Sequence, residues 1–190
     1  MLELATLGLL QSEPLHGYRL KQQLELFMSC CISVNYGAIY PLLRRLEERG
    51  EISTYAIDHT EAGLSRKTYC ITDKGRERWQ EIMLENPHES WVNSRSRFTI
   101  KFFFFSHLKP VERVKLLKSR VNACQVRLES IELENPLPLD FYASIVWNRS
   151  LTVLRSEIEW LNEQLTKEEQ ELHKSDQLAE TPTIFSQRQS

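Results

Sequence analysis

The stretch from Val34 to Ile52 constrains the fold most strongly, because a helix-like pattern ends within it and strand-like patterns begin. Its sequence is VNYGAIYPLLRRLEERGEI, and Gly50 is a candidate C-cap. Apolar residues recur at the spacing i, i+3, i+4 and i+7, which marks one face of an α-helix. The spacing therefore predicts a helix that packs on the rest of its domain through this apolar stripe. The stripe consists of Ile39, Leu42, Leu43 and Leu46.

Two strand-like runs follow this helix. EISTYAIDH and KTYCITD are rich in β-branched and aromatic residues, and the polar segment TEAGLSR separates them, with Gly63 at its centre. This pattern predicts a β-hairpin. Two further helices are expected upstream, over Leu2–Leu10 and from about His16 to Phe27. Three helices and then a two-stranded hairpin is the order of a winged helix-turn-helix, within a chain that is mainly α.

The second half of the chain has helical patterns throughout. A helix after the hairpin begins with Thr72 or Asp73 as its N-cap, and another covers Trp91 to His107. Heptad-type apolar spacing predicts two longer helices on either side of the NPLPLD break at 135–140. The expected regions are a winged helix-turn-helix over 1–85, an α-helical dimerisation domain over 90–172, and a disordered tail over 173–190.

The composition limits the class of protein. The chain is 41% hydrophobic and 26% charged, as in soluble globular proteins, and no apolar run reaches the ~18–20 residues of a membrane span. The first residues, MLELATLGLL, lack a basic region and a small-residue cleavage site, so a cytoplasmic location is expected. No HExxH, P-loop, Rossmann or G-x-S-x-G pattern is present in the sequence, so we expect neither an enzyme nor a cofactor nor a metal site.

The overall charge does not by itself indicate a nucleic-acid ligand. The formal net charge is −2, and residues 1–80 hold ten basic and ten acidic side chains. DNA binding, however, needs a local basic surface rather than a basic chain. Five basic residues and only two acidic ones lie between Ser65 and Arg78, so the second strand and the start of the next helix supply such a surface.

The N-terminal end of the 34–52 helix carries residues that suit contact with DNA. In helix-turn-helix proteins the recognition helix enters the major groove with this end first. A glycine lets the backbone approach closely, and a tyrosine offers a ring for a thymine methyl and a hydroxyl for phosphate. The alternative is that the tyrosines pack on the preceding helix. The candidate residues are Tyr36, Gly37, Tyr40 and Arg44, with Ser33 or Asn35 as the N-cap.

Arg66 and Lys67 lie at the start of the second predicted strand, beside the loop of the hairpin. A cationic hairpin tip can reach the minor groove or its phosphates, where arginine is attracted by the potential of a narrow groove. The alternative is a solvated tip, for which lysine and arginine are common. Because a candidate recognition helix precedes the hairpin, we favour the DNA-binding interpretation of both residues.

With these motifs the sequence resembles the PadR family of bacterial transcriptional regulators, over about residues 1–170. The second half resembles the helical C-terminal domain of the longer members, a subgroup that includes virulence activators. The matching motifs are LGLLQSEPLHGYRLKQQL (7–24), YGAIYPLLRRLEERGEI (36–52), SRKTYCITDKGRE (65–77), FTIKFFFFSHL (98–108) and IVWNRSLTVLRSEIEWLNEQL (145–165).

The resemblance implies a homodimer that binds a palindromic operator in double-stranded DNA, usually as a repressor and sometimes as an activator. It places Gly17 and Tyr18 at the start of the supporting helix, where they can touch the DNA backbone. It also implies that the tyrosine-bearing helix reads DNA and that the hairpin is the wing. The alternative, from another class, is a protein-interaction adaptor that keeps the fold without binding DNA.

The C-terminal half supplies the predicted dimer contact. Its heptad seams can pack within one chain, between two chains, or both. The aromatic residues of this half suit either a cavity for a planar small-molecule effector or a packed core and interface, and we favour the second. Cys30 and Cys31 are a weaker candidate for a redox sensor. The predicted dimer residues are Phe102, Phe105, Trp147, Leu151, Leu154, Ile158, Leu161 and Leu165.

Overall fold

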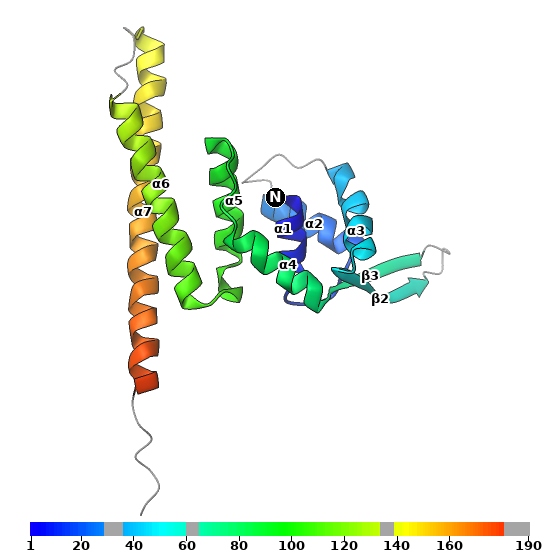
Figure 1. The fold of residues 1–190 in the computed structure, drawn as a ribbon. Coiled ribbons are helices and arrows are strands. Elements are labelled where there is room, and N and C mark those ends of the chain that lie inside the picture. Colours follow the sequence, from blue (N-terminus) through cyan, green and yellow to red (C-terminus); the bar gives the residue numbers. More distant parts are fainter. Residues whose placement is uncertain (29–35, 60–64, 134–138, 181–190) are drawn as a thin grey trace, which may run out of the picture. The chain divides into compact units, whose positions relative to one another are not determined.

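The computed structural model divides into two compact units, Met1–His107 (unit 1) and Leu108–Ser190 (unit 2). Unit 1 combines short helices with a small sheet, and unit 2 is built from two long helices (Figure 1). The described residues are 1–28, 36–59, 65–133 and 139–180.

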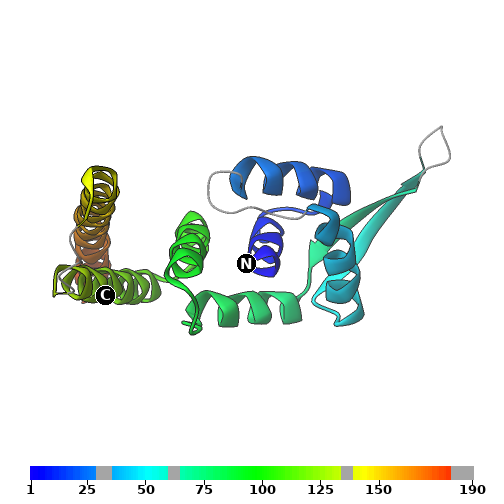
Figure 2. The ribbon, with the colours of Figure 1, turned by 90° about the horizontal axis from the view of Figure 1, so that it is seen from above.

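Unit 1 has the predicted order of three helices, a hairpin and further helices. In both ribbon views the hairpin β2–β3 projects from the group of helices (Figures 1 and 2). The elements in chain order are α1 (Leu2–Leu9), β1 (Leu15–His16), α2 (Gly17–Met28), the 3₁₀ turn η1 (Tyr36–Ala38), α3 (Ile39–Glu48), β2 (Ile52–His59), β3 (Ser65–Ile71), α4 (Asp73–Leu84), α5 (Trp91–Phe103) and the 3₁₀ turn η2 (Phe105–His107).

The sheet has three antiparallel strands in the order β1-β3-β2, whereas the sequence predicted two. The added strand is β1, in which Leu15 pairs with Tyr69 and His16 with Thr68. The His16 Nδ1 atom lies 2.7 Å from the Thr68 hydroxyl, which reinforces this pairing. A two-residue strand is too short to show a period of two, so the sequence placed His16 in the following helix instead.

The apolar stripe of α3 is buried, as predicted. Ile39, Leu42, Leu43 and Leu46 all face the core of unit 1. The remaining core comes from α1, α2, β2, α4 and α5, so the stripe joins α3 to the whole unit rather than to one neighbour. The largest fully buried side chains of these other elements are Leu4, Leu7, Leu20, Leu24, Ile52, Met83 and Ile100.

The base of the hairpin is fixed by two glycines. Gly50 follows α3 with φ +71°, a left-handed conformation that glycine adopts without steric cost. Gly75 lies in the first turn of α4, where a Cβ atom would come within 1.9 Å of the Glu51 carbonyl oxygen. Thr72 caps α4 by accepting a hydrogen bond of 3.1 Å from the Gly75 amide, which decides between the two predicted caps. The hairpin therefore starts and ends against α4.

The helix predicted over 91–107 is interrupted. The α-helix α5 stops at Phe103, and the chain continues as η2. Gly8 of α1 has no side chain to keep the Phe104 ring away, since a Cβ atom there would lie 2.6 Å from the ring. Trp79 meets Phe104 and His107 edge-on, with ring centroids 6.4 and 6.0 Å apart. The break lets the chain pack these rings, which is the arrangement of a core.

Unit 2 is an antiparallel pair of helices, α6 (Pro110–Leu133) and α7 (Phe141–Glu180), which lie side by side in Figure 1. The α7 helix continues beyond residue 173, where the sequence pattern predicted the start of a tail. Heptad positions of the two helices form the contact. The buried apolar residues of this unit include Leu108, Val114, Leu116, Leu117, Val121, Cys124, Leu154 and Leu161.

Candidate DNA-binding surface

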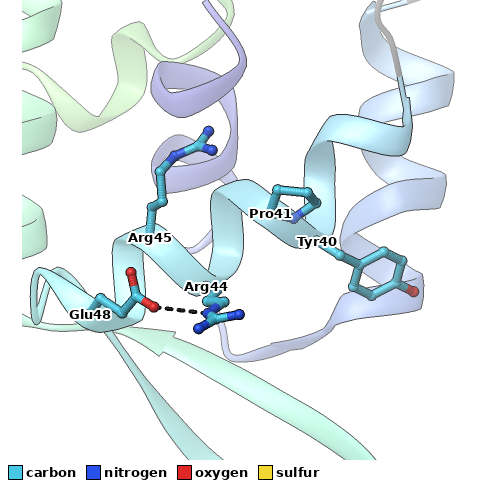
Figure 3. Close-up of a pocket in the computed structure, with 5 residues that line it drawn as sticks. All are labelled: Tyr40, Pro41, Arg44, Arg45 and Glu48. Atoms are coloured by element: carbon cyan, nitrogen blue, oxygen red, sulfur yellow. Dashed lines mark hydrogen bonds and ion pairs between the residues drawn. The ribbon is translucent and has the colours of Figure 1, made fainter.

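The side of α3 opposite its apolar stripe carries Tyr40, Arg44 and Glu48, which we call the α3 arc. Residues four apart lie on the same side of a helix, and all three side chains are exposed, Tyr40 by 55%. The Arg44 Nε atom donates to the Glu48 Oε1 atom at 2.8 Å (Figure 3). The arc thus combines an aromatic hydroxyl, a guanidinium and a carboxylate on one face.

The start of α3 accommodates residues that would disrupt the middle of a helix. Gly37 lies in the 3₁₀ turn η1 and is exposed, so it does not interrupt the α-helix. Pro41 is the third residue of α3, and the first four amides of a helix have no intrahelical acceptor. Its missing N–H therefore costs no helical hydrogen bond, and the apolar ring is left at the surface beside Tyr40 (Figure 3).

Three elements position the Tyr40 ring. A Cβ atom added to Gly17, the first residue of α2, would lie 3.3 Å from Tyr40 Cε1, 3.6 Å from Tyr69 Cε2 and 3.8 Å from Leu43 Cδ1. The absence of this side chain lets the ring lie against the start of α2 near the sheet. Tyr40 is thus both packed and exposed, so the alternatives of core packing and ligand contact are not exclusive at this residue.

Tyr18 lies beside Gly17 and is exposed by 62%. Its hydroxyl accepts a hydrogen bond of 3.2 Å from Gln22 Nε2, one turn along α2. The first turn of α2 therefore presents a second tyrosine hydroxyl close in sequence to the glycine that packs on Tyr40.

The wing, the hairpin formed by β2 and β3, is linked to α3 by polar contacts. Lys67 Nζ lies 3.3 Å from Glu47 Oε2, and the Thr54 hydroxyl donates to Glu47 Oε1 at 2.5 Å. The Thr54 hydrogen bond, aided by Lys67 and opposed by partial burial, lowers the pKa of Glu47 below its usual value. Arg66 pairs with Asp58 through the backbone of the two strands. One carboxylate thus joins the helix to both strands of the wing.

Several predicted residues lie at or beyond the limits of the described part of the chain. Ser33 and Asn35, as well as the cysteine pair of the redox hypothesis, fall outside the described residues. Tyr36 and Arg66 are described by their backbone only. The structure thus brings Tyr40, Arg44 and Glu48 together on one face of α3, while Lys67 lies on the wing against the base of the same helix.

Two family models match this sequence in consecutive segments. The model of the transcriptional regulator PadR-like family matches residues 6–81, which contain the helices, the α3 arc and the wing described above. The model of the virulence activator alpha C-terminal domain matches residues 94–168. This chain therefore contains a PadR-like domain followed by a virulence activator alpha C-terminal domain. Members of the PadR-like family are transcriptional regulators, not enzymes.

Similar solved structures include PadR of Bacillus subtilis in complex with operator DNA, 24% identical over 88% of this chain and 98% of that chain, with a TM-score of 0.44. A PadR-like transcriptional regulator of Bacillus cereus is 24% identical over 90% and 99%, with a TM-score of 0.40. Another from B. cereus strain ATCC 14579 is 35% identical over 42% and 75%, with a TM-score of 0.34. Among curated proteins the sequence has no significant match.

The PadR-like surface has features that the sequence analysis did not identify. An open depression along α3 is lined by Tyr40, Pro41, Arg44, Arg45 and Glu48 (Figure 3). Tyr55 on β2 is exposed by 71%. The Arg44–Glu48 pair has the i, i+4 spacing of a helical ion pair and was recognisable in the sequence. The contacts of Glu47 with the wing join residues 7 and 20 positions apart, for which no local pattern exists.

The predicted dimer residues occupy different environments. Leu154 and Leu161 are buried within the chain, as is Phe105, so they offer little surface to a second copy. The other five (Phe102, Trp147, Leu151, Ile158 and Leu165) are half-buried. A separate group of large apolar side chains is exposed at the start of α7, namely Phe141, Tyr142, Ile145 and Val146. Their spacing places them on one side of the helix.

No described helix has the length and apolar character needed to cross a membrane. In the same part of the chain, histidine, cysteine and carboxylate side chains form no group of three suited to a metal ion.

Proposed function

We propose that this PadR-like regulator binds a palindromic operator as a homodimer in the cytoplasm and represses transcription from it. The observation that carries the proposal is the α3 arc, in which Tyr40 and Arg44 are exposed on the side of α3 away from the core. A helix held by one face and bare on the other fits the major groove of B-DNA. Tyr40 supplies a ring for base edges and a hydroxyl for phosphate.

The wing and the start of α2 would add contacts to the sugar–phosphate backbone. Lys67 on β3 and Tyr18 on α2 are exposed and carry groups that donate hydrogen bonds. Phosphate contacts fix the register of a protein on DNA, while base contacts select the sequence. We therefore assign Tyr40 to sequence selection, and Lys67, Tyr18 and the wing residue Arg66 to positioning.

Dimerisation is supported by the surface of unit 2. The side chains of Phe141, Tyr142, Ile145 and Val146 form an exposed apolar group on α7, and Leu133 at the end of α6 is also exposed. Large exposed apolar patches mark interaction surfaces in soluble proteins. A second copy would cover such a surface, and the half-buried positions Trp147 and Leu151 continue it along α7. Two linked DNA-binding units then gain affinity, because the second contact is intramolecular.

Selection of bound fragments from random DNA, combined with sedimentation equilibrium of the free protein, tests this proposal. We expect an inverted repeat with half-sites about 10 base pairs apart, or a multiple of that spacing, and a dimer in solution. A reporter gene downstream of the selected site should be less active when the regulator is present. A monomer, or selected fragments with no shared inverted repeat, would contradict the proposal. Increased reporter activity would contradict the repressor assignment alone.

A further inference from the structure

The cations Arg44 of α3 and Lys67 of the wing each have a carboxylate at close range. Arg44 lies 2.8 Å from Glu48, and Lys67 lies 3.3 Å from Glu47. The two glutamates are adjacent in the sequence, at the end of α3. The surface assigned to DNA binding therefore carries its own anions beside its cations.

These pairs contribute little to the stability of the fold. The side chains of Arg44 and Glu48 are 81% and 59% exposed, and exposed pairs are screened by water and salt. The effect of the carboxylates on a ligand is larger, because phosphates bind to positive charge and are repelled by negative charge. Glu48 therefore affects the binding of a phosphate-bearing ligand to α3 more than it affects the stability of the fold.

The two carboxylates are held differently. Glu47 accepts the Thr54 hydrogen bond as well as the lysine contact, so it is fixed between α3 and the wing. Glu48 accepts its hydrogen bond from Arg44, on the same helix, and both side chains are exposed to water. A guanidinium can exchange this partner for a phosphate oxygen, because both offer the same type of acceptor.

We infer that Glu48, with Glu47 in support, is a specificity-determining residue that acts as an internal counterion of the DNA-binding surface. Each carboxylate occupies a cation that would otherwise bind any phosphate. Non-specific binding comes almost entirely from such charge contacts, whereas a specific complex also gains from base contacts. Glu48 therefore weakens binding to unrelated DNA more than binding to the operator. This inference rests on the proposed DNA-binding function of α3.

The test compares full-length wild type with Glu48→Gln by fluorescence anisotropy on two labelled duplexes, one of random sequence and one selected from random DNA by the wild type. We expect Glu48→Gln to bind the random duplex about two- to fivefold more tightly at low salt. The slope of log affinity against log salt should steepen by about one for that duplex. Binding to the selected duplex should tighten less, so the ratio of the two affinities falls.

Glu81→Gln is the matched control, since Glu81 is an exposed carboxylate of α4 paired with Arg78 at 3.1 Å. It removes the same charge and should change random-duplex affinity less than Glu48→Gln does. Glu47→Gln is a second variant of the surface and should also tighten binding to the random duplex. Thermal unfolding of this variant checks that the contacts of Glu47 with the wing are not needed for folding.

Three outcomes would overturn the inference. Glu48→Gln and Glu81→Gln would have equal effects if only net charge mattered. Glu48→Gln would tighten both duplexes equally if the residue set affinity alone. A loss of binding to the selected duplex would indicate that Glu48 contacts a base directly, as carboxylates do with the cytosine amino group. Wild type that binds neither duplex would instead contradict the proposed function, so the two failures are distinguishable.

Discussion

Unit 1 and unit 2 each contain an arginine paired with a glutamate, but in opposite environments. Arg44 and Glu48 are exposed on α3, whereas the side chains of Arg120 on α6 and Glu157 on α7 are only 3% and 13% exposed. An exposed pair is worth about 0–1 kcal/mol. A buried charge that loses its partner is costly, because neither water nor another charge replaces it. The exposed pair is therefore exchangeable, whereas the buried pair is structural.

The arginine of the second pair makes two contacts with the same oxygen. Arg120 Nη2 donates to Glu157 Oε1 at 2.6 Å, and Arg120 Nε donates to it at 3.2 Å. Cys124 lies one turn further along α6, with its sulfur 3.9 Å from this oxygen. The pair thus joins α6 and α7 within the apolar seam, where the dielectric is low and the interaction is strong.

Replacing Arg120 with Met should have the largest effect on stability. We expect a loss of about 3 kcal/mol in the free energy of unfolding, because the half-buried charge of Glu157 loses the guanidinium that pairs with it. Urea unfolding followed by circular dichroism measures this change. The double variant Arg120→Met/Glu157→Leu should recover most of the loss, since it removes both charges from the seam.

Arg155→Met is the matched control for this prediction, because Arg155 pairs with Glu132 across the same two helices at 2.7 Å but is exposed. Its cost should be below about 1 kcal/mol. Equal losses for Arg120→Met and Arg155→Met would remove the distinction between structural and exchangeable pairs.

Lys101 extends the comparison to a buried cation in unit 1. Its ammonium donates to the Glu85 carbonyl oxygen at the end of α4. Burial, and secondarily the charge of Arg97, lower the pKa of Lys101 to about 8, against the opposing effect of Glu85 and Glu89. The unfolded chain binds this proton up to a pKa near 10.5, so between about pH 8 and 10.5 the unfolded state holds more protons than the folded state. The contribution of Lys101 to stability therefore rises with pH over this range.

Lys101→Met should remove this rise, which amounts to roughly 3 kcal/mol at most. Unfolding free energies of wild type and variant, measured from pH 7 to 10.5, give the difference directly. Lys74→Met is the control, because Lys74 also donates to a backbone carbonyl, that of Arg49 at 2.7 Å, but is exposed. Its pH profile should parallel that of wild type. An unchanged pH profile in Lys101→Met would show that this ammonium is accessible to water.

Arg44→Ala should have the smallest effect on stability and a measurable effect on the affinity for DNA. We expect the free energy of unfolding to change by less than about 0.5 kcal/mol. Affinity for a selected duplex should fall about threefold or more, and the salt slope should decrease by about one, because one phosphate contact is lost. Thermal unfolding and anisotropy titrations of the same preparation measure both. A large loss of stability with unchanged DNA affinity would make this pair structural, like that of Arg120.

The sequence predicted the larger elements because their patterns repeat. The buried stripe of α3 and the heptad positions of α6 each extend over several turns, and the hairpin consists of two runs rich in β-branched and aromatic residues. The strand β1 was missed because Leu15 and His16 are too few to show a period, and the end of α5 because Phe104 packs on Gly8, which is distant in the sequence. Such tertiary contacts outweigh local propensity.

The candidate site was predictable in part for the same reason. Tyr40 and Arg44 lie opposite a clear apolar stripe, so their exposure follows from the pattern. The role of Glu47, which joins α3 to Thr54 and Lys67, depends on how the wing folds back on the helix. No regular spacing in the sequence predicts this contact. The sequence therefore indicates the surface and its Arg44–Glu48 pair, while the structure adds the contacts of Glu47 with the wing.

The affinity of Tyr40→Ala for a DNA duplex selected by the wild type tests the central claim most directly. Tyr40→Phe, which keeps the ring that packs near Gly17, separates the contribution of the hydroxyl from that of the ring. We predict that Tyr40→Ala binds about tenfold more weakly while sedimentation shows an unchanged oligomer, and that Tyr40→Phe lies between the two. Wild-type affinity in Tyr40→Ala, with the same oligomeric state, would show that α3 does not read DNA.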